Sequence, residues 1–181
     1  MSDIVQIADF ASGRYYIPTG CYETANLQQF IDETESEYLD KLLGCSLATL
    51  LIADLVDGEP TNPEYQAWFN KFCYTPECCG NGCYMSHCCV TPEIQSQGVK
   101  IMLMGYVYYG YVRDLQISKT ITGMNDANNE NSTITDLGNL QINTDNRRNI
   151  SARTFNAIKN KIAKNTTCNQ CVYEEIQTLF G

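Results

Sequence analysis

The feature that most constrains this chain is a run of twelve uncharged, mostly apolar residues, 101–112, near the middle of the sequence. Lys100 precedes the run, and Arg113 and Asp114 follow it. Because a helix that spans a membrane needs about 20 apolar residues, twelve indicate a buried helix instead. The run is apolar over more than one helical face, which is typical of a central element. We expect this helix to cover residues 92–115 and to form the middle of the core.

Helical spacing and end signals predict three helices before it. The first covers residues 26–43 and ends at Gly44, and the second begins near Ser46 and ends at Gly58. Asn62 as cap and Pro63 at the first helical position mark the start of the third. An aromatic stripe at i, i+3, i+4 and i+7 predicts that this third helix packs in the core. The stripe consists of Tyr65, Trp68, Phe69 and Phe72.

Two segments lack the helical spacing of apolar residues. Residues 1–25 are punctuated by glycine and proline, so we expect an N-terminal arm that a neighbour must order. Residues 116–146 are rich in Asn, Thr, Asp and Gly and predict an extended loop, in which residues 117–122 and 137–142 would pair as a hairpin. A loop of this length inside a compact domain usually has a function or is disordered, and both alternatives stay open.

The C-terminal part predicts a basic helix over residues 146–164 and a last short helix near the end of the chain. The residues expected to face inward in these two helices are Ile150, Phe155, Ile158, Ile162, Tyr173, Ile176 and Phe180. The predicted fold is therefore mainly α, a helical bundle of five or six helices with a long extended loop or hairpin arm. Residues 26–181 form one helical domain, which contains a Cys-rich insertion at 73–91 and the loop at 116–146.

The charge of the chain is strongly acidic and unevenly distributed. A formal net charge of -9 argues against a general nucleic-acid binder, which would need clustered Lys and Arg. Residues 23–57 carry eight acids against Lys41 alone, whereas residues 147–164 carry six bases and no acid. Two alternatives follow: the segments attract each other, within one chain or between subunits, or they are two solvated helix faces.

Short catalytic motifs are missing from the sequence. His87 is the single histidine, which excludes mechanisms that need two imidazoles. Neither a P-loop nor a G-x-S-x-G elbow occurs. Adjacent carboxylates such as Asp32 and Glu33 diverge on a helix and are typical of a solvated surface. We therefore expect no enzymatic activity, no catalytic residues and no cofactor. The N-terminus shows no secretion signal, and the chain is expected in a reducing cytoplasm.

One feature of the sequence suggests specific chemistry: a cluster of six cysteines and His87 within seventeen residues. Its cysteines are Cys73, Cys78, Cys79, Cys83, Cys88 and Cys89, and a Cys168-x-x-Cys171 pair follows far away. Four alternatives stay open: structural zinc, disulfide or redox chemistry, thiols packed as small apolar groups, and a catalytic cysteine with His87. Because the spacing does not fit the usual zinc fingers, we predict no metal site.

Several segments resemble, in order and spacing, a family of head-tail connector proteins of tailed bacteriophages of the crAss-like type. Residues 37–55 resemble the family's paired N-terminal helices, and residues 97–114 its central helix. Residues 119–123 and 130–132 match its extended loop, and residues 147–149 and 155–158 its C-terminal helix. The resemblance covers about residues 24–165, and the Cys cluster departs from it.

The resemblance implies a structural virion protein. Members of the family stack beneath the portal as rings, commonly dodecameric, which bridge capsid and tail in the neck and let DNA pass. The implied partners are copies of the chain itself, the portal protein and other connector or tail proteins, with DNA only in non-specific proximity and no membrane. Assembly in the host cytoplasm is implied. The alternative from another class is a small zinc-binding regulatory or interaction module, which rests on the Cys cluster.

Overall fold

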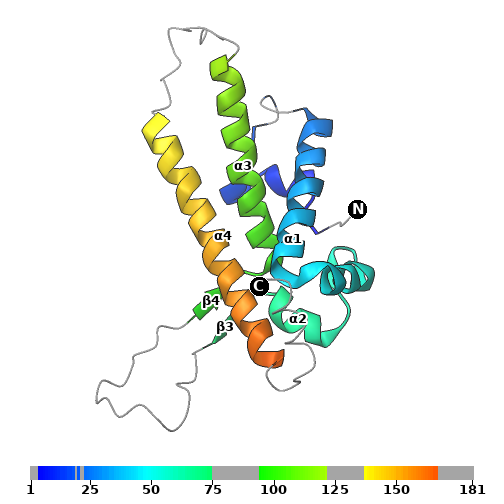
Figure 1. The fold of residues 1–181 in the computed structure, drawn as a ribbon. Coiled ribbons are helices and arrows are strands. Elements are labelled where there is room, and N and C mark those ends of the chain that lie inside the picture. Colours follow the sequence, from blue (N-terminus) through cyan, green and yellow to red (C-terminus); the bar gives the residue numbers. More distant parts are fainter. Residues whose placement is uncertain (1–3, 19, 21–22, 75–93, 122–136, 167–181) are drawn as a thin grey trace, which may run out of the picture.

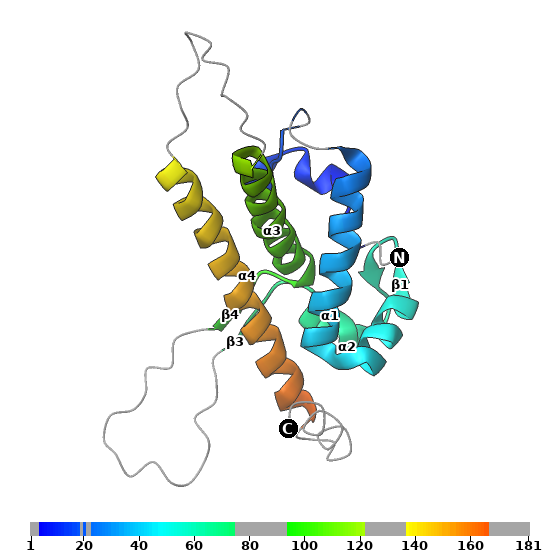
Figure 2. The same ribbon diagram turned by 45° about the horizontal axis from the view of Figure 1, so that its top comes forward.

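The computed structural model of the protein describes residues 4–18, 20, 23–74, 94–121 and 137–166. This part of the chain is mainly helical, with four helices of seven residues or more and two small two-stranded sheets. The three long helices, α1, α3 and α4, lie side by side with α3 in the middle (Figures 1 and 2). Helix α2 and both sheets lie at one end of this layer.

Helix α1 spans Thr24–Asp54 and is broken at Gly44, whose φ of 74° and ψ of 159° are not helical. A positive φ is cheap for glycine and strained for other residues, so the helix changes direction here. The two expected helices are therefore present, joined without a loop, but the second ends at Asp54 and not at the predicted Gly58. After α1, strands β1 (Leu55–Val56) and β2 (Glu59–Pro60) pair antiparallel. Asp57 and Gly58 form the turn between them, with φ of 53° and 80°. Positive φ at both central residues is typical of tight hairpin turns.

Helix α2 spans Pro63–Phe69 and begins as the sequence predicts. The side-chain oxygen of Asn62 accepts a hydrogen bond of 2.9 Å from the Glu64 backbone amide, and Pro63 follows the cap. The predicted aromatic stripe is wrong at its last member. Trp68 and Phe69 are buried, but the helix ends at Phe69, and Phe72 lies in strand β3. Helical spacing of aromatic residues alone does not make a helix continue beyond its C-terminal cap.

The central helix α3 spans Val99–Ile121 and begins later than predicted. Strand β4 (Ile94–Ser96) takes the place of the expected first turn and pairs antiparallel with β3 (Phe72–Tyr74). Gly98 then turns the chain into α3 with a φ of 91°. A Cβ at this glycine would lie 3.0 Å from the Phe69 carbonyl oxygen, so the chain turns tightly against the end of α2. Strands of three residues are too short to give a readable sequence period.

Helix α4 spans Leu137–Thr166 and corrects the predicted loop at 116–146. Residues 116–121 continue α3, and residues 137–146 form the first turns of α4, so the predicted hairpin is wrong. Asn, Thr and Gly are poor helix formers, but an established helix gains a hydrogen bond with each residue that it adds. Residues 122–136, most of the Cys-rich insertion and the expected last helix lie outside the described residues.

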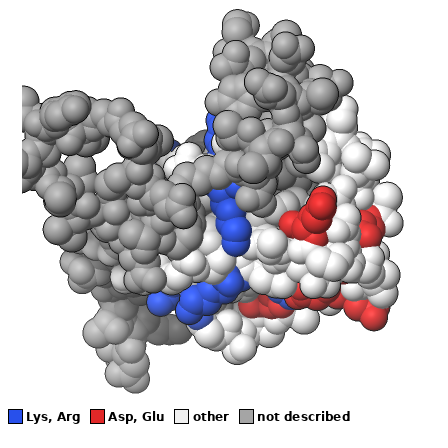
Figure 3. Space-filling view, turned by 90° about the horizontal axis from the view of Figure 1, so that it is seen from below, with Lys and Arg blue, Asp and Glu red and all other residues white. Residues whose placement is uncertain are grey.

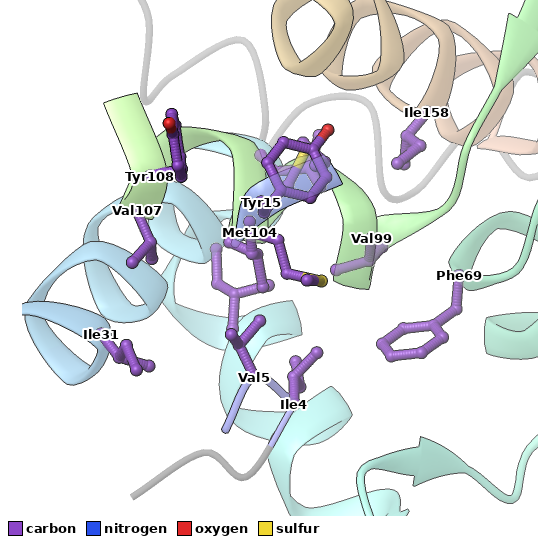
Figure 4. Close-up of a cluster of buried hydrophobic side chains, with 14 of the residues drawn as sticks. Ile4, Val5, Tyr15, Ile31, Phe69, Val99, Met104, Val107, Tyr108 and Ile158 are labelled. Atoms are coloured by element: carbon purple, nitrogen blue, oxygen red, sulfur yellow. The ribbon is translucent and has the colours of Figure 1, made fainter. Parts of the chain in front are cut away.

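The N-terminal segment packs into the core of its own chain, contrary to the expected arm. It forms two short 3₁₀ helices, η1 (Ile7–Phe10) and η2 (Gly13–Tyr15). Its buried side chains pack with α1 and α3 (Figure 4). The Val5 amide also donates a 2.6 Å hydrogen bond to Oε1 of Glu35, a fully buried residue of α1. The buried residues of this segment are Ile4, Val5, Phe10, Tyr15 and Ile17.

Helix α3 supplies the centre of the core, as predicted. Met102, Leu103 and Val107 are completely buried, whereas Tyr109 and Val112 are half-buried. Helix α4 contributes Ile158 and Ile162, while Ile150 and Phe155 are half-buried. In the described part of the chain, no helix combines the length and the apolar character that crossing a bilayer requires.

Candidate functional site

The acidic and basic segments lie on different helices. Exposed carboxylates on α1 form what we call the acidic flank: Glu33, Glu37 and Asp40. Exposed cations on α4 form the basic flank: Arg148, Arg153 and Lys159. Because α3 lies between α1 and α4, the flanks belong to the two sides of the helical layer. Seen from the α2 end, Lys and Arg form a strip through the middle of the view, and Asp and Glu lie to one side (Figure 3).

The two flanks do not neutralise each other through ion pairs in the described part of the chain. The ion pairs observed there are Lys41 with Glu37, within α1, and Lys100 with Asp9, at 2.9 Å between α3 and the N-terminal segment. Glu33, Asp40, Arg148 and Arg153 have no ion-pair partner among the described residues. Of the predicted alternatives, attraction within one chain is therefore not observed between these groups. Attraction between subunits and plain solvation remain.

Two cations of the basic segment have structural roles instead. The Lys161 ammonium donates a hydrogen bond to the Ala67 carbonyl in the last turn of α2 and lies 3.9 Å from the Phe72 ring centroid. Burial lowers the pKa of Lys161. The Arg147 guanidinium lies 4.1 Å from the ring centroid of Tyr108, which is buried. These contacts fix α4 against α2 and α3, so the segment holds the fold together as well as presenting charge.

Two half-buried tyrosines of α3 contact neighbouring side chains, Tyr109 through its hydroxyl and Tyr106 through its ring. The Tyr109 hydroxyl accepts a 2.7 Å hydrogen bond from Arg113. Tyr106 stacks on Tyr38 of α1, with ring centroids 3.7 Å apart and planes inclined by 14°. Burial and, to a lesser degree, the nearby Tyr38 raise the pKa of Tyr106 to about 12, while Arg148 opposes the shift. Burial also raises the pKa of Tyr38.

This shift predicts a stability change at alkaline pH. The folded-state pKa of Tyr106 lies above the unfolded value of 10.0, so the folded chain holds this proton longer. The stabilisation is complete below about pH 10 and is lost as the pH rises towards about 12. Relative to Tyr106→Phe, the free energy of unfolding of the parent should fall by about 1 kcal/mol between pH 9 and 12. This value allows for screening of the partly exposed hydroxyl by solvent. Urea unfolding of both chains at each pH measures it, and a constant difference would contradict it.

A shallow pocket lies between η2 and the start of α3. Its lining residues are Ser12, Gly13, Arg14, Tyr15, Gln97, Ile101 and Met104. Tyr15 is buried, and its hydroxyl has no hydrogen-bond partner among the described residues. Burial raises the pKa of this hydroxyl, while Arg14 and Arg147 partly oppose the shift. The polar groups of the lining are the Ser12 and Tyr15 hydroxyls, the Arg14 guanidinium and the Gln97 amide.

Comparison with protein-family models, with curated proteins and with solved structures found no match.

The predicted cysteine chemistry falls largely outside the described residues. His87 and five cysteines of the cluster, as well as Cys168 and Cys171, belong to segments that the structure does not describe. Cys73 lies exposed in β3, and Cys45 is exposed on α1. Among the described residues, His, Cys, Asp and Glu form no group of three or more that would hold a metal ion. The zinc hypothesis therefore stays untested.

One group of residues was not anticipated from the sequence. Tyr38 and Tyr109 come together with Arg113 and Arg148 on the surface shared by α1, α3 and α4. The sequence indicates part of this group, because Tyr109 and Arg113 are four residues apart and so lie on one helix face. It does not indicate Arg148, since only the packing of α4 on α3 brings it there.

Proposed function

We propose that this chain is a structural virion protein, not an enzyme, that assembles into a homo-oligomeric ring in the head-tail connector of a tailed phage. The ring, of 12-fold symmetry as the resemblance implies, bridges portal and tail in the neck of the virion and lines the DNA passage. It assembles in the host cytoplasm without a membrane partner. Its partners are further copies of the chain, the portal protein and other connector or tail proteins.

The distribution of the resembling segments supports this proposal. Residues 37–54 form the kinked part of α1 and Leu55 begins β1, residues 97–114 lead into and build α3, and residues 147–149 and 155–158 lie in α4. These are the three helices of the layer, so the segments that resemble the connector family are neighbours in space. The finer architecture that we propose is a connector domain of five or six helices, with α1 counted as two.

The observation that carries the proposal is the placement of exposed opposite charges on α1 and α4, where Glu33 and Asp40, and Arg148 and Arg153, have no ion-pair partner among the described residues. A contact between the acidic flank of one copy and the basic flank of the next joins two different surfaces. Such head-to-tail contacts generate a ring when the rotation between copies closes. The net charge of -9 also suits a channel wall, because acidic surfaces repel DNA and let it slide.

The proposal predicts a large particle that depends on ionic strength. At low salt, light scattering of the purified protein should give one discrete mass, a fixed multiple of 20.4 kDa. Because exposed charges are screened within about 3 Å at 1 M salt, the mass should fall towards that of the monomer as salt is raised. A ring whose mass is unchanged in molar salt would remove the charged flanks from this account. A monomer at every salt concentration would contradict the ring itself.

A further inference from the structure

A surface patch shared by α1, α3 and α4 combines three tyrosines with cations. We call Tyr38, Tyr106, Tyr109, Arg113 and Arg148 the tyrosine-arginine patch. The three tyrosines are half-buried and both arginines are exposed. The guanidinium carbons of Arg113 and Arg148 lie 5.2 and 5.1 Å from the Tyr109 ring centroid. Tyrosine and arginine are the residue types that most often anchor protein interfaces.

Each ring of this patch already has a contact over at least one of its faces. Tyr38 and Tyr106 stack on each other, and both arginines lie over Tyr109. Proteins that bind single-stranded nucleic acid offer open ring faces on which bases stack. The patch therefore favours contact with another protein, through hydroxyl groups and guanidinium N–H groups.

The two arginines have N–H donors left over for a negatively charged partner. Neither has an ion-pair partner among the described residues, although Arg113 donates one hydrogen bond to the Tyr109 hydroxyl. A guanidinium carries five N–H donors and binds carboxylates through two of them at once. Since each lies about 5 Å from the same ring centroid, the two guanidinium groups are at most about 10 Å apart.

The acidic flank of α1 offers two carboxylates for these arginines. Glu33 and Asp40 are exposed and have no ion-pair partner among the described residues, whereas Glu37 between them is paired with Lys41. Seven residues of helix, two turns, separate them by about 10.5 Å along the axis, which places both on one exposed helix face. Because both side chains are flexible, the two carboxylates can approach two guanidinium groups that are up to about 10 Å apart.

We infer that the tyrosine-arginine patch of one copy binds the acidic flank of a second copy, with Glu33 and Asp40 paired to Arg113 and Arg148. The inference rests on the proposed ring and identifies the residues of its subunit contact. Because the two surfaces differ, the contact is head-to-tail. Arg148 belongs to both the basic flank and the tyrosine-arginine patch. The patch is therefore the part of the basic flank that contacts the next copy.

Two charge-reversed variants test the contact, and all substituted residues are exposed. Variant A carries Arg113→Glu and Arg148→Glu, and variant B carries Glu33→Lys and Asp40→Lys. Each should raise the protein concentration at which half of the chains are assembled by roughly 10- to 100-fold. Variant A has two acidic surfaces and variant B two basic ones, so an equimolar mixture should assemble again, with the two variants alternating. Analytical ultracentrifugation measures the masses.

A matched control carries the same charge change elsewhere. Arg14→Glu with Lys71→Glu alters two exposed cations outside the patch and should assemble like the parent. If the parent forms a ring while variants A and B assemble equally well, the contact is wrong and the ring stands. Defective variants whose mixture stays unassembled would also overturn the pairing. A monomeric parent would overturn the ring, a result distinct from both.

Discussion

Replacing Phe10 by alanine should lower the free energy of unfolding by about 3–5 kcal/mol, the range for a fully buried phenylalanine. Phe10 is completely buried at the end of η1 and packs with the hydrophobic core. Truncation leaves a cavity that the surrounding helices fill only partly. Urea unfolding followed by circular dichroism measures the loss, which is a large part of the stability of a single domain.

Tyr16 provides the control for this prediction, because it belongs to the same segment and is 47% exposed. Tyr16→Ala should change the stability by no more than about 0.5 kcal/mol, the usual range for surface positions. If both variants unfold like the parent, the N-terminal segment is a loose arm after all, and its order must come from a neighbouring chain.

The second large effect is expected at Gly105, where α3 and α4 approach closely. A Cβ on Gly105 would lie 1.9 Å from the Ser151 hydroxyl oxygen, and 3.3 Å from the Arg147 carbonyl oxygen. Gly105→Ala forces Ser151 to move and should cost about 1–3 kcal/mol, although alanine favours the helix. Gly105→Leu should cost more, because the larger side chain separates the two helices.

Removing the Ser151 hydroxyl should relieve part of this clash. In a Ser151→Ala background, Gly105→Ala should cost at least about 1 kcal/mol less than in the parent, and a double-mutant cycle measures this coupling. Gly20→Ala is the control, since a Cβ there meets nothing within 4 Å. Strictly additive costs at the two positions would mean that the helices do not meet there.

The parts of the fold that the sequence predicted are those set by local chemistry. Asn62 and Pro63 mark the start of α2, and its capping hydrogen bond is present. Gly44 marks the break in α1 because its φ is positive. The apolar run at 101–112 became the buried middle of α3, since a helix apolar on several faces has to be enclosed.

The parts that the sequence did not predict depend on tertiary contacts. The buried residues of the N-terminal segment follow no period, because 3₁₀ turns and extended backbone alternate there. The helical ends at 116–121 and 137–146 have the composition of a loop, so their sequence predicts a loop and not a helix. Intrinsic propensity is a weak predictor where neighbouring structure can extend a helix.

The candidate site, too, could be predicted from the sequence only in part. The acidic and basic segments are visible as charge runs, but their separation by α3 requires the packing of three helices. The patch around Tyr109 combines α3 residues with Arg148, which is 39 positions away in the sequence. No local pattern links residues at that distance.

Electron microscopy of the purified protein at low salt tests the central claim most directly. Averaged end-on views should show a closed ring of identical subunits around an opening wide enough for a DNA duplex. Head-to-tail contacts that close give a particle of fixed size. Twelve copies of 20.4 kDa, the number that the resemblance implies, would have a mass of about 245 kDa. Single globular particles of one chain, or open filaments without closure, would contradict the assignment of this protein as a ring subunit.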